Sequence, residues 1–311
     1  MDQASLAQTD AVVGGDSAVV SSVRYVAIGD SIARGFQTTW PRPWRRDGCA
    51  VRVAGIPLRW FDDLAGAYPV AVAQMLSHAL GQRVDLDMRL TCSGTRTDHL
   101  WREDAPTNLL RSGFDQPADL VTLTLGANDL IPLWYRYIAA IAVFRPVRAI
   151  VSQTVQRAVR DRFVPEPQGS VEAARGMEHR LRSILAWICE RSPSAQIIVT
   201  TYHLADAADA THGGFSRPLV DAIRAAVDGC PSASLVDVAM VLAPSQPDGR
   251  SISRLDGFHP TRAGQRRIAV AIADEAARRM PLSAAPRRGP GDHEPATSAW
   301  PPARGSFRPR R

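Results

Sequence analysis

The sequence predicts a three-layer α/β/α sandwich with a five-stranded parallel sheet, because strand-like and helix-like patterns alternate along it. Apolar, β-branched runs bounded by Gly, Asp, Pro or Ser are typical of strands, and they cover residues 24–28, 84–90, 120–125, 196–201 and 234–241. Helical spacing of apolar residues covers 68–80, 171–190, 215–227 and 261–280. Strands that alternate with helices form parallel sheets, and such sheets bind ligands at the carboxyl ends of their strands.

The length of the chain predicts one folded domain with two tails. One α/β domain and its extensions account for 311 residues, of which 45% are hydrophobic. We expect a flexible leader over 1–22, the folded domain over 23–281 and a disordered Pro- and Arg-rich tail over 282–311. The polar start lacks the basic and apolar regions of a secretory signal, which favours a cytoplasmic location.

The charge distribution argues against a nucleic-acid partner. The formal net charge is +6, and every basic residue is arginine. Six arginines and only two carboxylates lie after residue 286. The remaining chain is nearly balanced, whereas a nucleic-acid groove needs clustered positive charge on the fold itself. No run of about 18 apolar residues predicts a transmembrane segment.

The cysteines do not have the spacing of a metal site. Cys49, Cys92, Cys189 and Cys230 form no C-x-x-C pair, so we expect no zinc and no other metal. Four cysteines allow two disulfides, which an oxidising compartment would favour and a reducing cytosol would not. The sequence leaves both states of the cysteines open.

Ser31 is the first candidate for chemistry. It ends the segment Tyr-Val-Ala-Ile-Gly-Asp-Ser over residues 25–31, directly after the first predicted strand. A serine at the carboxyl end of a strand can be presented as a nucleophile. Its hydroxyl is a poor nucleophile until a base removes the proton, so a partner has to be found elsewhere in the chain.

His259 is the candidate base, and Asp256 is the candidate partner of its ring. Histidine titrates near neutral pH, as a general base requires. His259 has a carboxylate three residues before it, within Asp-Gly-Phe-His-Pro. One short loop would then present both groups. The alternative is that His259 merely precedes Pro260 at the start of the last helix.

Three groups are candidates for an oxyanion hole, which needs N–H donors where negative charge develops. They are the backbone N–H of Ser31, the unobstructed N–H of Gly94 in Cys-Ser-Gly-Thr and the amide of Asn128 in Gly-Ala-Asn-Asp. Taken singly, Gly94 is equally well a turn residue and Asn128 a local cap. Together with Ser31, Asp256 and His259, they describe a complete serine hydrolase site.

These blocks, in this order, resemble the SGNH family of hydrolases, also called GDSL esterases and lipases, over residues 24–279. The resemblance implies a flavodoxin-like sandwich that needs no cofactor and acts on small-molecule or lipid esters. It further implies that Ser31 is the nucleophile, that His259 is the base with Asp256 as its partner, and that Ser31, Gly94 and Asn128 form the oxyanion hole. We therefore expect a serine esterase or lipase. An acyltransferase or a deacylase of a metabolite or sugar, using the same site, is the alternative.

Two further features bear on substrate and location. The context of the cysteines is most similar to an actinobacterial secreted esterase branch, which implies pairing of Cys49 with Cys92 and of Cys189 with Cys230. Export by a route that does not use a recognisable signal peptide therefore stays open. The irregular segments 36–66 and 131–167 are rich in tryptophan or other aromatic residues. The second either lines an acyl pocket or packs as ordinary core helices.

Overall fold

A computed structural model describes part of the chain, and every described residue falls within the first of its two units, Met1–Pro281. The described ranges are 22–35, 52–53, 56–57, 63–130, 167–203, 216–243, 251–252 and 259–280. The expected tail, and all of the expected leader except Ser22, lie outside these residues. The domain boundaries therefore stay a prediction.

The central element is a five-stranded parallel sheet with the order β4-β1-β7-β8-β9. Its strands are β1 (Val23–Gly29), β4 (Val84–Thr91), β7 (Leu120–Thr124), β8 (Gln196–Thr200) and β9 (Ala233–Val236). All four neighbouring pairs are parallel, and β1 lies between β4 and β7. The chain starts near the centre of the sheet, so the order reverses at β1. Ligand sites of open parallel sheets lie at such a reversal.

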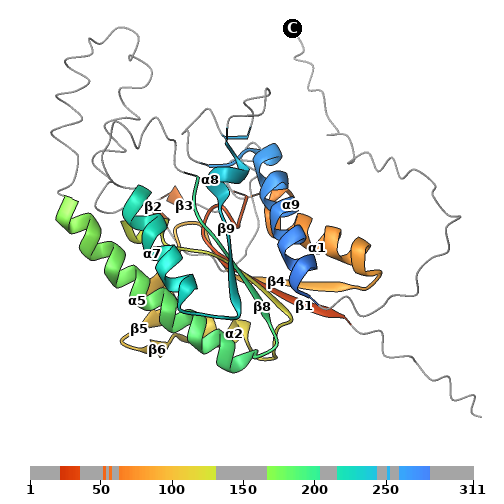
Figure 1. Ribbon diagram of the computed structural model, residues 1–311, viewed down its shortest axis with the longest axis horizontal. Coiled ribbons are helices and arrows are strands. Elements are labelled where there is room, and N and C mark those ends of the chain that lie inside the picture. The colour runs from red at the N-terminus through yellow and green to blue at the C-terminus, as the bar shows by residue number, and fades with distance from the viewer. Residues whose placement is uncertain are drawn as a thin grey trace, which may run out of the picture. The chain divides into compact units, whose positions relative to one another are not determined.

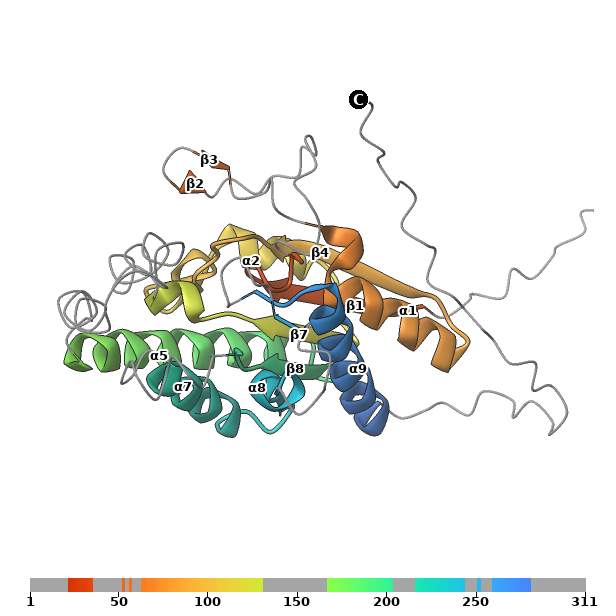
Figure 2. The ribbon, with the colours of Figure 1, turned by 90° about the horizontal axis from the view of Figure 1, so that it is seen from above.

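Helices cover both faces of this sheet, which confirms the predicted sandwich (Figure 1). On one face α1 (Tyr68–Leu80) packs against α9 (Arg262–Arg279), and on the other α5 (Pro167–Arg191) packs against α7 (Ser216–Asp228). The view from above separates the α5–α7 layer from α1 (Figure 2). None of the described helices combines the length and the apolar character needed to cross a membrane.

Short elements complete the described chain. They are β2 (Arg52–Val53), β3 (Ile56–Pro57), η2 (Leu64–Gly66), η3 (Thr97–His99), β5 (Trp101–Arg102), β6 (Ala105–Pro106), α2 (Asn108–Gly113) and α8 (Val238–Val241). Apart from β2, β3, Asp63 and η2, the irregular segment 36–66 lies outside the described residues, as does 131–167 apart from Pro167. The expected acyl pocket therefore stays a prediction.

Local signals explain most helix limits. Thr261 caps α9 by accepting a hydrogen bond from the Gly264 N–H, and α1 ends at Gly81, whose φ of 61° suits glycine. The predicted strand over 234–241 is wrong beyond Val236. The Asp237 side chain accepts bonds from the N–H groups of Ala239 and Met240, so these residues start α8 instead.

The core lies between the sheet and the two helical layers, and several of its buried hydroxyl groups are paired. The Tyr25 hydroxyl bonds Thr122 at 2.8 Å, and the Tyr68 hydroxyl bonds Thr124 at 2.7 Å. Thr124 in turn bonds Thr200 at 2.8 Å. These bonds link α1 to three strands and satisfy polar groups that would be costly to bury alone.

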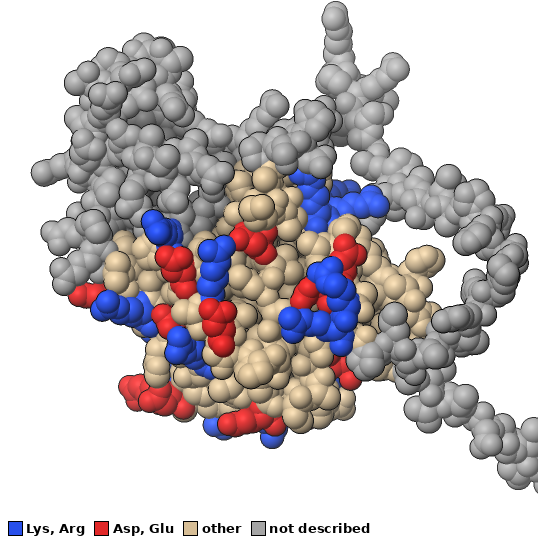
Figure 3. All heavy atoms as spheres, viewed as in Figure 1, with Lys and Arg blue, Asp and Glu red and all other residues tan. Residues whose placement is uncertain are grey.

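The exposed charges of the visible face are mixed. Figure 3 shows arginine and carboxylate side chains interspersed over this face, without a patch of one sign among the described residues. Ion pairs among the described residues include Arg224 with Asp237 at 2.7 Å. This face does not have the clustered positive charge of a nucleic-acid surface.

Candidate active site

Ser31 lies in a tight turn at the carboxyl end of β1. The turn is anchored on β7, because the Asp30 N–H donates to the Thr124 carbonyl at 3.1 Å. It also requires glycine at its start: a Cβ on Gly29 would lie 2.5 Å from the Ala33 Cβ and 3.1 Å from the Thr124 oxygen. The absence of a side chain at Gly29 thus lets the chain reverse sharply.

Ser31 and His259 meet across 228 residues of sequence, with their Oγ and Nε2 atoms 2.8 Å apart. His259 precedes the capped start of α9. That start is held in place by the Thr261 N–H, which donates to the Ser251 carbonyl at 2.9 Å. When Nε2 accepts from the hydroxyl, the ring proton resides on Nδ1. Asp256, the expected partner of Nδ1, lies outside the described residues.

Gly94 and Asn128 follow the two strands that flank β1. Gly94 follows β4, in a turn that is tied to β1 by the Cys92 N–H donating to the Gly29 carbonyl at 2.9 Å. Gly94 has a φ of 86°, in the region that favours glycine. Asn128 follows β7 and reaches the Gly94 turn, because its Nδ2 donates to the Thr95 carbonyl at 3.1 Å. Three adjacent strand ends therefore carry Gly94, Ser31 and Asn128.

The N–H donors at this edge of the sheet differ in their partners. Among the described residues, no acceptor takes the backbone N–H of Ser31 or of Gly94. The Asn128 amide is engaged: Nδ2 donates to Thr95 and, at 3.2 Å, to Asp30 Oδ2. A primary amide has two N–H donors. A substrate oxyanion would have to take over one of these two bonds.

Asp30 is a buried carboxylate next to Ser31, with an exposed fraction of 1%. Oδ1 accepts from the Ile32 N–H at 3.0 Å, and Oδ2 accepts from the Tyr202 hydroxyl at 2.6 Å as well as from Asn128. Burial raises the pKa of Asp30 to about 6, although the bonds from Tyr202 and Ile32 oppose the rise. The carboxylate is thus held in place by three donors.

A second buried carboxylate supports the Asn128 loop. The Asp129 side chain, 3% exposed, accepts bonds from the N–H and hydroxyl of Thr97 and forms an ion pair with Arg180 of α5 at 3.1 Å. Arg180 also donates to the Thr97 hydroxyl at 2.7 Å. Burial raises the pKa of Asp129, while Thr97 and Arg180 oppose the rise. These contacts hold η3, the Asn128 loop and α5 together.

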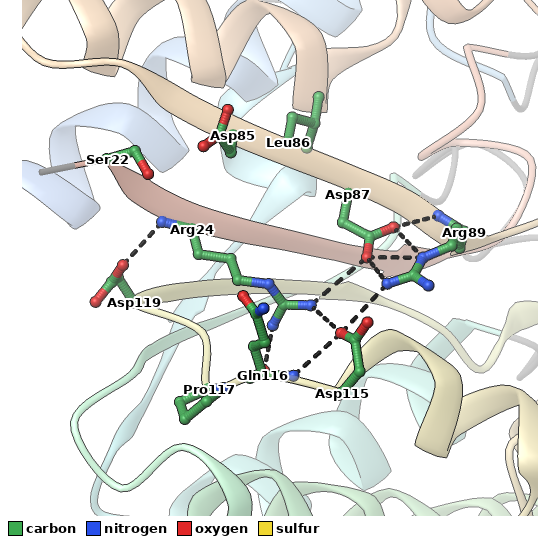
Figure 4. Close-up of a pocket in the computed structure, with 10 residues that line it drawn as sticks. All are labelled: Ser22, Arg24, Asp85, Leu86, Asp87, Arg89, Asp115, Gln116, Pro117 and Asp119. Atoms are coloured by element: carbon green, nitrogen blue, oxygen red, sulfur yellow. Dashed lines mark hydrogen bonds and ion pairs between the residues drawn. The ribbon is translucent and has the colours of Figure 1, made fainter. Parts of the chain in front are cut away.

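A charged cavity of about 580 Å³ lies at the other end of the sheet, where β1 and β7 begin, and it continues along β4 (Figure 4). Arg24 projects between Asp87 and Asp115, at 3.7 and 2.9 Å. Arg89 pairs with the same two carboxylates. Arg24, Arg89, Asp87 and Asp115 of this cavity pair with one another, and Ser31 lies at the opposite end of β1. In the described part of the chain, no cluster of His, Cys, Asp or Glu is suited to bind a metal.

The structure thus brings together Ser31, Gly94, Asn128 and His259 of the predicted site residues. Sequence reasoning missed the groups around them: Asp30, Thr95, Thr97, Asp129, Arg180 and Tyr202. Three of these had a signal, since Asp30 precedes Ser31, Thr95 follows Gly94 and Asp129 follows Asn128 within the predicted blocks. Tyr202 and Arg180 had none, because only the fold places them there.

The fold defines a class of protein, the α/β/α sandwich hydrolases with a central five-stranded parallel sheet. The GDSL-like Lipase/Acylhydrolase family model matches residues 27–267, and the chain belongs to this family. The chain is accordingly an SGNH-type carboxylic-ester hydrolase, as its sequence blocks suggested. A comparison with curated proteins finds no match.

Solved structures with the same fold include two proteins from Streptomyces. An extracellular lipase from Streptomyces rimosus is 18% identical, with a TM-score of 0.51, over 82% of this chain and 99% of the lipase. Phospholipase A1 from Streptomyces albidoflavus NA297 is 20% identical, with the same TM-score of 0.51, over 82% of this chain and 99% of the phospholipase. At these identities the likeness concerns the fold.

Proposed function

We propose that the chain hydrolyses carboxylic esters through an acyl-enzyme on Ser31. The observation that carries this proposal is the 2.8 Å contact between Ser31 Oγ and His259 Nε2, formed at the carboxyl end of the central strand. A serine within hydrogen-bond distance of a neutral imidazole can lose its proton as it attacks. Asp256 would orient the ring and stabilise the imidazolium.

The proposed reaction has two halves that balance. Ser31 Oγ attacks the ester carbonyl, His259 takes the hydroxyl proton and returns it to the departing alcohol, and an acyl-serine remains. Water then attacks the acyl-serine while His259 removes its proton and gives it back to Ser31 as the acid leaves. The same atoms serve both halves, so no cofactor is needed.

The oxyanion would be stabilised by the N–H groups of Ser31 and Gly94 and by the Asn128 amide. Two of these donors have no acceptor in the described part of the chain, which supports this assignment. For Asn128 the proposal requires an exchange, in which the developing oxyanion replaces either Asp30 or the Thr95 carbonyl. Donors at such a position each contribute about 10²–10³ in rate.

Turnover of p-nitrophenyl esters, from acetate to a long acyl chain, tests the proposal. We expect Ser31→Ala to lower turnover by about 10³-fold or more, while Ser234→Ala, which truncates a buried serine on β9, keeps it. Mass spectrometry of a fluorophosphonate-treated sample should place the adduct on Ser31. Retention of most activity in Ser31→Ala would refute the mechanism.

The ester series also addresses the substrate. The names of the two Streptomyces neighbours, a lipase and a phospholipase, make lipid esters one class to include. The preferred chain length would show whether a long acyl group is accommodated. A wild-type protein that is labelled on Ser31 but inactive on every ester would favour the alternative, acyl transfer or deacylation of a metabolite or sugar. Adding alcohols or amines as acceptors would then reveal a transferred acyl group.

The location of the chain stays a prediction. The polar N-terminal residues favour the cytoplasm, whereas Cys92 is disulfide-bonded to a partner outside the described residues. Disulfides persist in oxidising compartments and are rare in the cytosol. Fractionation of a producing culture decides between a cytoplasmic enzyme and one exported by another route.

A further inference from the structure

Gln265 is a buried amide close to the proposed nucleophile, although it belongs to the other end of the chain. It lies in the first turns of α9, six residues after His259, and its exposed fraction is 1%. Its backbone N–H donates to the carbonyl of the cap residue Thr261 at 2.8 Å. The position of Gln265 is therefore coupled to the segment that carries His259.

The Gln265 side chain makes two hydrogen bonds to backbone on other elements. Nε2 donates to the carbonyl of Ile32, the residue directly after Ser31, at 2.9 Å. Oε1 accepts from the N–H of Tyr68, the first residue of α1, at 3.0 Å. The first N–H groups of a helix have no partner within the helix, so this bond satisfies a group that would otherwise be buried unpaired.

Only a side chain with both a donor and an acceptor can make these two bonds together. A carboxylate at this position would accept from Tyr68 but face the Ile32 carbonyl with a second acceptor. A methionine of similar size would do neither. The amide therefore spans the Ser31 turn, the start of α1 and the start of α9.

We propose that Gln265 is a positioning residue that sets the distance between the His259 ring and the Ser31 hydroxyl. The proposal rests on the proposed acyl-enzyme mechanism and deepens it. Ser31 and His259 contact each other directly, and the bond between Gln265 and Ile32 is a second link between the same two segments. The first link has to break and re-form during the reaction as protons move. The second stays intact and holds the geometry.

Small displacements of reacting groups are costly, since a misplacement of about 1 Å can reduce a rate by about 10²-fold. Without the Ile32 bond, the start of α9 is held by the pairing of Thr261 with Ser251 and by packing against α1. Neither contact fixes it to the residue after the nucleophile. We therefore expect that losing the bond between Gln265 and Ile32 slows the chemical step and leaves substrate binding unchanged.

The test compares Gln265→Met with Ile272→Ala by two readouts. Ile272 is fully buried on the same helix, two turns further on, and its truncation should destabilise α9 without removing a side-chain hydrogen bond to Ile32 or Tyr68. The readouts are kcat and KM on the best p-nitrophenyl ester and the second-order rate of Ser31 labelling by a fluorophosphonate. Thermal melting and circular dichroism identify conditions where both variants are folded.

We expect Gln265→Met to lower kcat and the labelling rate by about 10- to 100-fold with KM within about twofold of wild type. Ile272→Ala should keep both rates within about threefold at an equal or lower melting temperature. Gln265→Glu, which retains the bond from Tyr68, should be no faster than Gln265→Met. If Gln265→Met fails to fold, Gln265→Glu takes its place in the comparison with Ile272→Ala.

Three results would overturn the positioning role: a labelling rate within about threefold of wild type in Gln265→Met, a loss confined to KM, or an equal loss in Ile272→Ala. Labelling separates this proposal from the proposed function. If the wild-type protein is labelled on Ser31 yet cleaves no ester, ester hydrolysis fails while the effect of Gln265 is still measured. If Ser31 is not labelled at all, the mechanism itself is wrong.

Discussion

The Asn128 amide and the Asp30 carboxylate are hydrogen-bonded, with Nδ2 and Oδ2 3.2 Å apart. Asp30 directly precedes Ser31, and Asn128 comes from the neighbouring strand. The proposed oxyanion donor is therefore oriented by a carboxylate adjacent to the proposed nucleophile. The Thr95 carbonyl completes its orientation from the Gly94 turn. The two strands that flank β1 thus contribute to one arrangement of donors.

Asn128→Ala should lower kcat by about 10²–10³ with a much smaller change in KM, because it removes a donor that acts mainly on the transition state. Steady-state kinetics on a p-nitrophenyl ester measure the effect. Asn108→Ala, at an exposed position in α2, is the matched control and should be neutral. A change confined to KM would show that Asn128 contacts substrate in another way.

Asp30→Asn should change how stability depends on pH. In the unfolded chain this carboxyl ionises near 3.8, whereas burial raises its pKa to about 6 in the folded protein. Between these values the folded state holds a proton that the unfolded state has lost. The contribution of Asp30 is fully present below pH 3.8 and is lost as the pH rises through 6.

The free energy of unfolding of wild type minus that of Asp30→Asn should therefore fall by roughly 2–3 kcal/mol between pH 4 and pH 7. Urea denaturation at several pH values measures this difference. A difference that rises with pH would mean that the carboxylate form is the favoured one in the folded protein.

Arg180→Met should destabilise the protein by about 3–5 kcal/mol at neutral pH, because it leaves the buried Asp129 carboxylate without its cation. Arg182→Met on the same helix is the control. Arg182 pairs with Glu178 at 2.7 Å, but the two side chains are 52% and 26% exposed, so its loss should cost at most about 1 kcal/mol. Denaturant unfolding of both variants checks the contrast.

The pKa of Asp129 is already raised by burial and should rise further without Arg180. Lowering the pH would then protonate Asp129 in the Arg180→Met variant and remove part of its penalty. We expect the deficit in stability to shrink as the pH falls from 7 towards 5. A deficit that is independent of pH would assign the effect to lost packing of the arginine side chain.

Gly264→Ala should disturb the start of α9, because its Cβ would lie 2.1 Å from the Ser251 carbonyl oxygen. The expected result is lower stability and lower turnover together, since His259 precedes this turn. Gly169→Ala in α5, where a Cβ meets nothing within 4 Å, is the control. It should raise stability by about 0.5–1 kcal/mol. Melting curves and kcat of the two variants give the comparison.

Cys189 and Cys230 should form a disulfide under oxidising conditions, because their Sγ atoms lie 3.2 Å apart as thiols. Burial and the neighbouring thiol raise the pKa of Cys189 to about 11, so oxidation should speed up with alkaline pH. Oxidised glutathione would accept the two electrons and leave as two thiols. Intact mass should show the loss of two hydrogen atoms.

The bridge would close a loop between residues 41 positions apart, which stabilises a folded chain by about 4 kcal/mol in the chain-entropy description. Cys230→Ser is the control and should show neither the mass change nor the rise in melting temperature. Two persistent thiols after oxidation at pH 9 would contradict the prediction.

Much of the fold was predictable because its signals are local. Alternating strand and helix patterns predicted all five sheet strands and the helices α1, α5, α7 and α9. The limits that failed depended on capping: Asp237 starts α8 where apolar residues had predicted more strand. A side-chain cap of this kind overrides the strand preference of Val238 and Val241.

The site was predictable only where its residues belong to short blocks. Ser31, Gly94, Asn128 and His259 were predicted, and the structure brings them together. The supporting groups depend on distant pairing, as between Tyr202 and Asp30 over 172 residues. Gln265 is surrounded in sequence by arginines, which suggests an exposed position, yet it is buried. The buried environment of Gln265 forms only when α9 packs against α1 and the Ser31 turn.

The pairing of Ser31 with His259 also has a consequence for the timing of activity. The proposed nucleophile emerges from the ribosome with the first strand, whereas its proposed base is synthesised just before the last described helix. For most of its synthesis, the nascent chain therefore carries Ser31 without its proposed general base. Under the proposed mechanism, premature termination anywhere before His259 would yield a protein without hydrolytic activity, so activity would appear only once translation has passed His259.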